Sequence, residues 1–384
     1  MKLFECQACG QPLYFENSRC ESCGRRLGYL PSIQDISALE PAGEGDWAAL
    51  ALPGTPFRFC ANAEHDVCNW LVPAGDANPY CRACRHNRTV PDLSSPQNLG
   101  RWRGLETAKR RLFYTLLKLG LPLATRAEDP QGLAFDFLAD PAENSPEGPS
   151  ILTGHDDGLI TINIAEADDA ERERRRHSMG EPYRTLLGHF RHEVGHYFWN
   201  VLVRNDPSLD GFRRIFGDER QDYGQALRDH YARGPKENWQ EEFVSAYAAS
   251  HPWEDFAETW AHYLHIVDTL ETANAFGLKM RPRIGRGSEL AADIDFDPHR
   301  EGDLDRLMAA WLPLTFAVNS LNRSMGQPDL YPFVLTPAVM TKLGFIHERI
   351  HRGRGDLPGD AEGRHGLKAV TGGPDSRAGM PQSA

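Results

Sequence analysis

The chain has 384 residues, of which 40% are hydrophobic and 25% charged, as is typical of a soluble globular protein. Its net charge of -12, from 42 basic and 54 acidic residues, argues against nucleic acid as a partner, because such binding relies on neutralising phosphates. No run reaches the roughly 18 to 20 apolar residues of a membrane helix, and the start of the chain lacks the apolar core of a signal peptide. We therefore expect a cytoplasmic protein without membrane contact.

Three regions of different composition follow one another along the chain. All eight cysteines lie between Cys6 and Cys84, and clustered cysteines in a reducing compartment are typical of metal ligands. Residues 1–95 are therefore predicted to form a cysteine-rich zinc-ribbon module with two zinc sites. Residues 96–350 carry the long amphipathic patterns of a main domain. Residues 351–384 are rich in glycine, proline and charge, and are predicted to form a disordered tail.

The first cysteine set consists of two Cys-x-x-Cys knuckles, each followed by a glycine. Four thiolates in this arrangement fit one closed, tetrahedral structural zinc. The predicted ligands are Cys6, Cys9, Cys20 and Cys23.

The second cysteine set contains only one knuckle and is predicted to hold a second structural zinc. Its members are Cys60, Cys68, Cys81 and Cys84. His65 or His86 could replace one of these cysteines, and residues 70–72 could form a short strand of the ribbon. The basic residues Arg82, Arg85, His86 and Arg88 are a candidate contact surface, although a solvated loop is the favoured interpretation.

Residues 96–350 show several long helical patterns and one clear strand. Apolar spacing and turn residues predict helices over 104–119, 182–203, 252–273 and 303–322, and a strand over 158–164. Several long helices with few strands indicate a mostly helical α+β domain with a small sheet.

The predicted helix 182–203 contains the motif His-Glu-x-x-His at residues 192–196. Residues four apart lie on one face of a helix, so His192 and His196 can bind one zinc ion. Glu193 then lies beside the metal and can act as general base towards a zinc-bound water. Catalytic zinc needs three protein ligands, so a third remains to be found.

The segment from Tyr247 to His262 is rich in acidic and aromatic residues and resembles the corresponding helix of the gluzincins. These zinc peptidases take their third ligand from a glutamate on a helix downstream of the His-Glu-x-x-His helix. The resemblance implies that Glu254 is this ligand and that Glu258 orients a histidine. It also implies that Tyr247 stabilises the oxyanion of the tetrahedral intermediate.

Other ligands are weighed against Glu254. Asp255 is the second choice, and His189, His262 and His265 are interpreted as packed or supporting histidines. Whether Asp255, His262 or His265 contributes to a metal site stays open at this stage. The metzincin pattern is excluded by Trp199 and Leu202, where that pattern needs glycine and histidine.

The complete layout, a cysteine ribbon followed by one His-Glu-x-x-His domain, resembles a bacterial family of zinc-binding metallopeptidases. This resemblance implies zinc-dependent hydrolysis of peptide bonds in a peptide or protein substrate, with one catalytic and two structural zinc ions. Extended substrate could pair with an edge strand at residues 159–164. The alternative is a non-catalytic zinc-binding adaptor whose ribbons recruit a protein or nucleic-acid partner.

Overall fold

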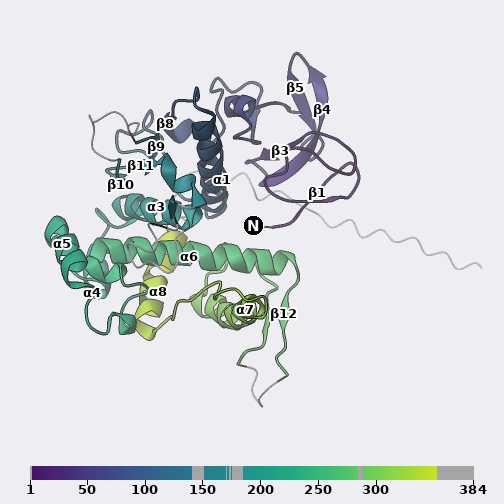
Figure 1. Ribbon diagram of the computed structural model, residues 1–384. Helices are drawn as coiled ribbons and strands as arrows, with labels where there is room; N and C mark the ends of the chain where they lie inside the picture. The colour runs from purple at the N-terminus through teal and green to yellow at the C-terminus, as the bar shows by residue number, and fades with distance from the viewer. Residues whose placement is uncertain are drawn as a thin grey trace, which may run out of the picture.

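The computed structural model of the chain describes residues 2–140, 151–169, 171, 172, 174, 185–283 and 289–352. These residues form a β-rich N-terminal part and a larger, mostly helical part with its own sheet (Figure 1), so the α+β prediction is confirmed. The predicted disordered tail falls mainly on residues 353–384, which lie outside the described residues. The last helix continues to Arg352.

The N-terminal part consists of a β-hairpin and a five-stranded antiparallel sheet in the order β3-β4-β5-β6-β7. The hairpin strands are β1 (Phe4–Glu5) and β2 (Pro12–Leu13). The sheet strands are β3 (Leu27–Leu30), β4 (Asp35–Gly43), β5 (Asp46–Ala49), β6 (Pro56–Phe59) and β7 (Leu71–Pro73). Phe15, Tyr29 and Trp70 pack edge to face or tilted in the core of this part, and Tyr114 from the first helix joins them. The β-rich part therefore shares its core with the main domain.

A second sheet has the order β10-β11-β9-β8. Its strands are β8 (Asn87–Thr89), β9 (Ala134–Leu138), β10 (Gly154–Asp156) and β11 (Leu159–Asn163). Strand β11 confirms the predicted strand, but it pairs with β9 on one side and β10 on the other. The expectation that substrate pairs with residues 159–164 is therefore wrong, because that strand is not an edge; β10 is.

Strand β8 follows the second cysteine set yet pairs in parallel with β9 of the main domain. The sheet thus crosses the predicted division near residue 95. A further two-stranded sheet is formed by β12 (Lys279–Met280) and β13 (Ala292–Asp293).

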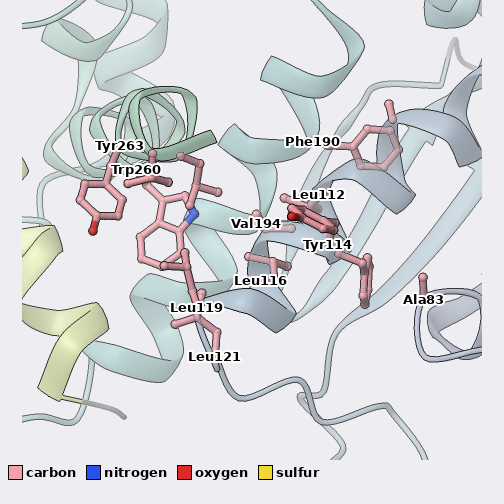
Figure 2. Close-up of a cluster of buried hydrophobic side chains, with 14 of the residues drawn as sticks. Ala83, Leu112, Tyr114, Leu116, Leu119, Leu121, Phe190, Val194, Trp260 and Tyr263 are labelled. Carbon is pink, nitrogen blue, oxygen red and sulfur yellow. The ribbon is translucent and has the colours of Figure 1, made fainter. Parts of the chain in front are cut away.

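The long helices lie largely where hydrophobic spacing predicts them. The helices are α1 (Pro96–Lys118), α3 (Leu186–Leu202), α4 (Leu209–Phe216), α5 (Tyr223–Arg233), α6 (Pro252–Ala275), α7 (Leu304–Ser324) and α8 (Pro337–Arg352). Helix α3 begins at Leu186 because the Thr185 side chain caps it by accepting from the Gly188 amide; residues 182–184 of the predicted helix lie outside the described residues. Figure 2 shows Leu112 of α1, Val194 of α3 and Trp260 of α6 meeting in one apolar cluster.

Helices α3 and α6 approach each other closely at Gly195. A Cβ atom at that position would lie 2.9 Å from the Cα atom of Ala257, so only glycine fits without a shift of the backbone. Gly195 lies between His192 and His196, and Ala257 lies between Glu254 and Glu258. The close crossing therefore places the two predicted sets of ligands side by side.

Candidate metal centre

Three predicted ligand atoms converge where α3 crosses α6. Nε2 of His192 lies 3.0 Å from Oε2 of Glu254, and Nε2 of His196 lies 3.5 Å from the same oxygen. A tetrahedral zinc with bonds of ~2.0 to 2.1 Å separates neighbouring ligand atoms by about 3.3 Å. The arrangement of the three atoms fits this ion.

The polar atoms of the centre are also suited to a cation. All three side chains are buried, and Oε2 of Glu254 has no hydrogen-bond partner among the described residues. A buried carboxylate oxygen is costly to leave unsatisfied, and a zinc ion would satisfy it. Burial alone would raise the pKa of Glu254, but the neighbouring His196 and His192 hold this pKa well below its ordinary value. Glu254 is therefore ionised.

Two of the three ligand side chains are held by a further polar contact. Nδ1 of His192 lies 2.7 Å from Oε1 of Glu258, whose other oxygen accepts a 2.6 Å hydrogen bond from Ser245. The structure thus places Glu258 where an orienting carboxylate is needed. Oε1 of Glu254 accepts a 2.6 Å hydrogen bond from the hydroxyl of Tyr223 on α5. Neither Tyr223 nor Ser245 was predicted, since a lone polar residue outside the motif helices gives no spacing signal.

Aromatic and imidazole rings surround the centre. The ring centroid of His196 lies 3.9 Å from that of Trp253. It lies 5.9 Å from the ring centroid of His155 on β10. Tyr247 lies with its ring 5.9 Å from that of His192. Burial and the charge of Glu254 raise the pKa of Tyr247 well above its ordinary value, so its hydroxyl stays protonated and can donate. The edge strand β10 therefore borders the predicted catalytic residues.

Glu193 is buried beside the three ligands and contacts His189, whose Nε2 atom lies 3.2 Å from its Oε1. Nδ1 of His189 lies 2.5 Å from Oε2 of Glu166. Burial would lower the pKa of His189, but the charges and hydrogen bonds of Glu166 and Glu193 raise it to about 9. Burial would raise the pKa of Glu193, but the hydrogen bond and charge of His189 lower it below its ordinary value. The predicted general base is therefore a carboxylate.

The alternative ligands have other partners. Asp255 lies 2.6 Å from the Lys342 ammonium on α8, and burial raises the pKa of this carboxyl to about 7 in spite of that cation. Nδ1 of His262 lies 2.7 Å from the Tyr331 hydroxyl. His265 contacts Arg191. Asp255, His262 and His265 therefore do not belong to the group of ligand atoms at the His192 centre.

Each predicted cysteine set converges on one point. Sγ atoms lie 3.7 Å apart for Cys6 and Cys23, 3.6 Å for Cys9 and Cys20, and 3.7 Å for Cys68 and Cys81. A tetrahedron with Zn–S bonds of ~2.3 Å has edges of about 3.8 Å, so both sets fit zinc. All eight predicted cysteines take part, four in each set.

One histidine and two arginines near the second set make contacts within the molecule. Nδ1 of His86 lies 2.8 Å from the carbonyl oxygen of Leu133, so this histidine does not replace a cysteine. Arg85 pairs with Asp76, and Arg88 pairs with Asp136 of β9. Two arginines of the basic cluster after the second knuckle, Arg85 and Arg88, are therefore engaged in ion pairs within the molecule.

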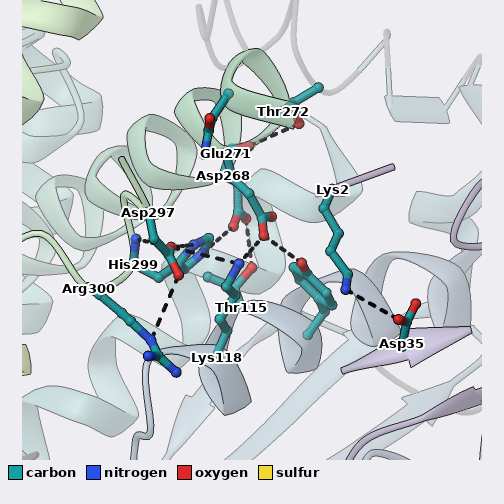
Figure 3. Close-up of polar contacts among 12 residues, drawn as sticks. Lys2, Asp35, Thr115, Lys118, Asp268, Glu271, Thr272, Asp297, His299 and Arg300 are labelled. Atoms are coloured by element: carbon teal, nitrogen blue, oxygen red, sulfur yellow. Dashed lines mark hydrogen bonds and ion pairs between the residues drawn. The ribbon is translucent and has the colours of Figure 1, made fainter. Parts of the chain in front are cut away.

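A fourth group of ligand-type side chains consists of Asp268 and Glu271 further along α6 and His299 from the segment before α7 (Figure 3). Two cations already contact it, because Lys118 pairs with Glu271 and Arg191 pairs with Asp268. Thr115 and Tyr114 donate hydrogen bonds of 2.7 and 2.6 Å to the two acids. We interpret the group as an ion-pair network that joins α1 to α6, because these cations would repel a metal ion.

Comparison with known proteins identifies the family of the chain. The profile of a family described as "Putative zinc-binding metallo-peptidase" matches residues 98–349, and that of a zinc-ribbon domain matches residues 3–95. Uncharacterized proteins of Mycobacterium tuberculosis (strain H37Rv) and Mycobacterium bovis are each 41% identical over 372 residues, which cover 96% of this chain and 100% of theirs. No solved structure matches significantly. Among the described helices, none combines the length and apolar character needed to span a bilayer. The chain belongs to this family of zinc-binding metallopeptidases and carries an N-terminal zinc ribbon.

Proposed function

We propose that the protein is a gluzincin-like peptidase that hydrolyses peptide bonds with one zinc ion held by His192, His196 and Glu254. The convergence of these three ligand atoms beside the buried Glu193 carboxylate carries the proposal. A carboxylate next to the ligands has no use in a purely structural zinc site, whereas a hydrolase needs a base there.

Each side chain of the centre has a chemical task. Zinc bound there supplies a Lewis acid that lowers the pKa of a coordinated water from 15.7 towards ~7. Glu193 takes a proton from the attacking water and later delivers it to the leaving amine. Tyr247 donates a hydrogen bond from its protonated hydroxyl to the developing oxyanion. Glu258 holds His192 in the orientation that presents Nε2.

The substrate is a peptide or protein segment in extended conformation. Strand β10 is an edge of the sheet and lies next to α3, and its His155 approaches His196. Among the described residues no strand pairs with the outer side of β10. An added peptide strand would pair there through backbone hydrogen bonds, which depend on backbone conformation and not on side-chain identity. The two cysteine sets hold one structural zinc each, which makes three zinc ions per chain.

The experiment combines zinc analysis with hydrolysis of a fluorescently labelled, unfolded protein. We expect wild type to bind about three zinc ions and to cleave the probe. Glu193→Gln should keep all three ions and lose activity by about 10² to 10⁴-fold. Glu254→Ala should lose one ion and the activity together. A Glu193→Gln variant as active as wild type would refute the mechanism, and a Glu254→Ala variant with three ions would refute the ligand assignment.

A further inference from the structure

A chain of polar side chains leads from the second sheet to the predicted general base. Nε2 of His189 lies 3.2 Å from Oε1 of Glu193, and Nδ1 of His189 lies 2.5 Å from Oε2 of Glu166. Oε1 of Glu166 accepts a 2.6 Å hydrogen bond from the Thr153 hydroxyl. Both ring nitrogens of His189 therefore face a carboxylate oxygen, and one of these carboxylates is Glu193.

Local structure explains why the chain of contacts is well defined. His189 and Glu193 are four residues apart on α3, so their side chains share one face of the helix. Glu166 lies on the short helix η3 (Ile164–Ala167), which follows β11 directly. Thr153 precedes β10, and its hydroxyl also accepts a 3.1 Å hydrogen bond from the amide of Asn163 at the end of β11. The far end of the chain of contacts is thus anchored to the backbone of the sheet.

Simple packing does not explain these residue types. Glu166 is 1% exposed and Glu193 is 5% exposed, and buried carboxylates are costly unless charged or hydrogen-bonded groups pair with them. Apolar side chains could join η3 to α3 without that cost. The pair of Glu166 and His189 contacts one oxygen of the Glu193 carboxylate, Oε1, and so fixes the orientation of that carboxylate.

We propose that His189 is a positioning residue that holds the Glu193 carboxylate through Oε1, so that Oε2 is presented to the attacking water. Glu166 and Thr153 fix the imidazole ring in turn. The proton taken from water goes to Oε2 of Glu193, and His189 neither gains nor loses one. This inference rests on the proposed peptidase function and adds three residues to its catalytic apparatus.

The test compares His189→Ala, His189→Gln and Glu166→Gln with wild type. We expect His189→Ala to keep three zinc ions and its KM while kcat falls by about 10 to 100-fold, as for other supporting contacts. His189→Gln retains an N–H donor and should recover part of kcat. His189→Ala should cause no further loss in a Glu193→Gln background, because His189 acts only through Glu193. His347→Gln removes another buried histidine, one bonded to Tyr263, and should leave kcat unchanged.

Several outcomes would overturn the proposal. One is a wild-type kcat in His189→Ala. Another is that His189→Ala lowers kcat by the same factor in the Glu193→Gln background as in wild type. A third is loss of the third zinc ion from His189→Ala. A crystal structure of zinc-loaded His189→Ala gives a readout independent of activity. The Glu193 carboxylate should leave its position while His192, His196 and Glu254 stay in place, and an unmoved carboxylate would refute the positioning role. Failure of the peptidase function is distinct, since wild type would then be inactive or Glu193→Gln fully active.

Discussion

Replacing Gly195 by alanine tests whether the close crossing of α3 and α6 sets the spacing of the metal ligands. The added Cβ would lie 2.9 Å from the Cα, 3.2 Å from the carbonyl oxygen and 3.3 Å from the Cβ of Ala257. Carbon atoms in favourable contact lie ~3.5 to 4.0 Å apart, so the helices must separate by about half an ångström or more. Two of these three atoms belong to the backbone and cannot rotate away.

The expected magnitudes follow from two opposing effects. Overpacking costs about 1 to 3 kcal/mol, whereas exchanging glycine for alanine inside a helix returns about 1 kcal/mol. The free energy of unfolding should therefore fall by roughly 0 to 2 kcal/mol. The displacement of Glu254 from the two imidazoles should be larger than the ~0.2 Å tolerance of a metal site. We expect zinc affinity at this centre to drop about tenfold or more.

Gly344→Ala is the matched control. This glycine lies inside α8, and an added Cβ would meet only the Cδ2 atom of Leu304, at an ordinary 3.6 Å. It should raise the free energy of unfolding by about 1 kcal/mol and leave zinc affinity unchanged. Urea unfolding and competition with a chromophoric chelator measure both quantities. The reasoning fails if Gly195→Ala gains as much stability as Gly344→Ala and keeps wild-type zinc affinity.

Three further predictions concern other parts of the molecule. A chelator should remove zinc from the first cysteine set before the second, because Cys9 is exposed whereas all four cysteines of the second set are buried. Cys9→Ser should abolish this early phase of zinc release. Lys342→Met should lower the free energy of unfolding by about 1 to 3 kcal/mol, because Asp255 then becomes a neutral buried carboxyl without its partner, yet the catalytic zinc should remain bound. Burial lowers the pKa of His299, but its hydrogen bond to Asp268 and its ion pair with Asp297 raise it above its ordinary value. The stabilisation by His299 is therefore complete below about pH 6.5 and is lost as pH rises through the folded-state pKa, so wild type should lose stability relative to His299→Gln in urea unfolding from about pH 6 to 9.

Spacing along a single helix was sufficient to predict part of the centre. His192, Glu193 and His196 lie within five residues, and helical periodicity alone places both imidazoles on one face. The choice between Glu254 and Asp255 could not be made from periodicity, because adjacent residues on α6 point about 100° apart and either could face α3. The crossing at Gly195 and the pairing of Asp255 with the Lys342 ammonium on α8 favour Glu254, and both are long-range contacts.

The supporting residues were beyond sequence reasoning for a similar reason. Tyr223, Ser245 and Glu166 each contribute one polar atom to a side chain on another element. A single polar residue on a short or exposed element has no periodic pattern that distinguishes it from a solvated one. His189 differs from them, because it lies one turn before His192 on the motif helix, and this spacing indicated a packed or supporting histidine near the site.

The order of strands in the second sheet has a consequence for the role of the ribbon. An alternating apolar pattern predicts a strand at β11, but not that β9 and β10 cover both of its edges. Strand β8 pairs with β9 and begins three residues after Cys84, and the intervening His86 contacts the carbonyl of Leu133 just before β9. The second cysteine set therefore holds one edge of a sheet whose opposite edge, β10, borders the metal centre. The same edge is held by the contacts of Asn87 with Glu106 and of Arg88 with Asp136. We expect zinc bound at the second set to add to the stability of this sheet, so the ribbon belongs to the framework of the main domain as much as it forms a separate module.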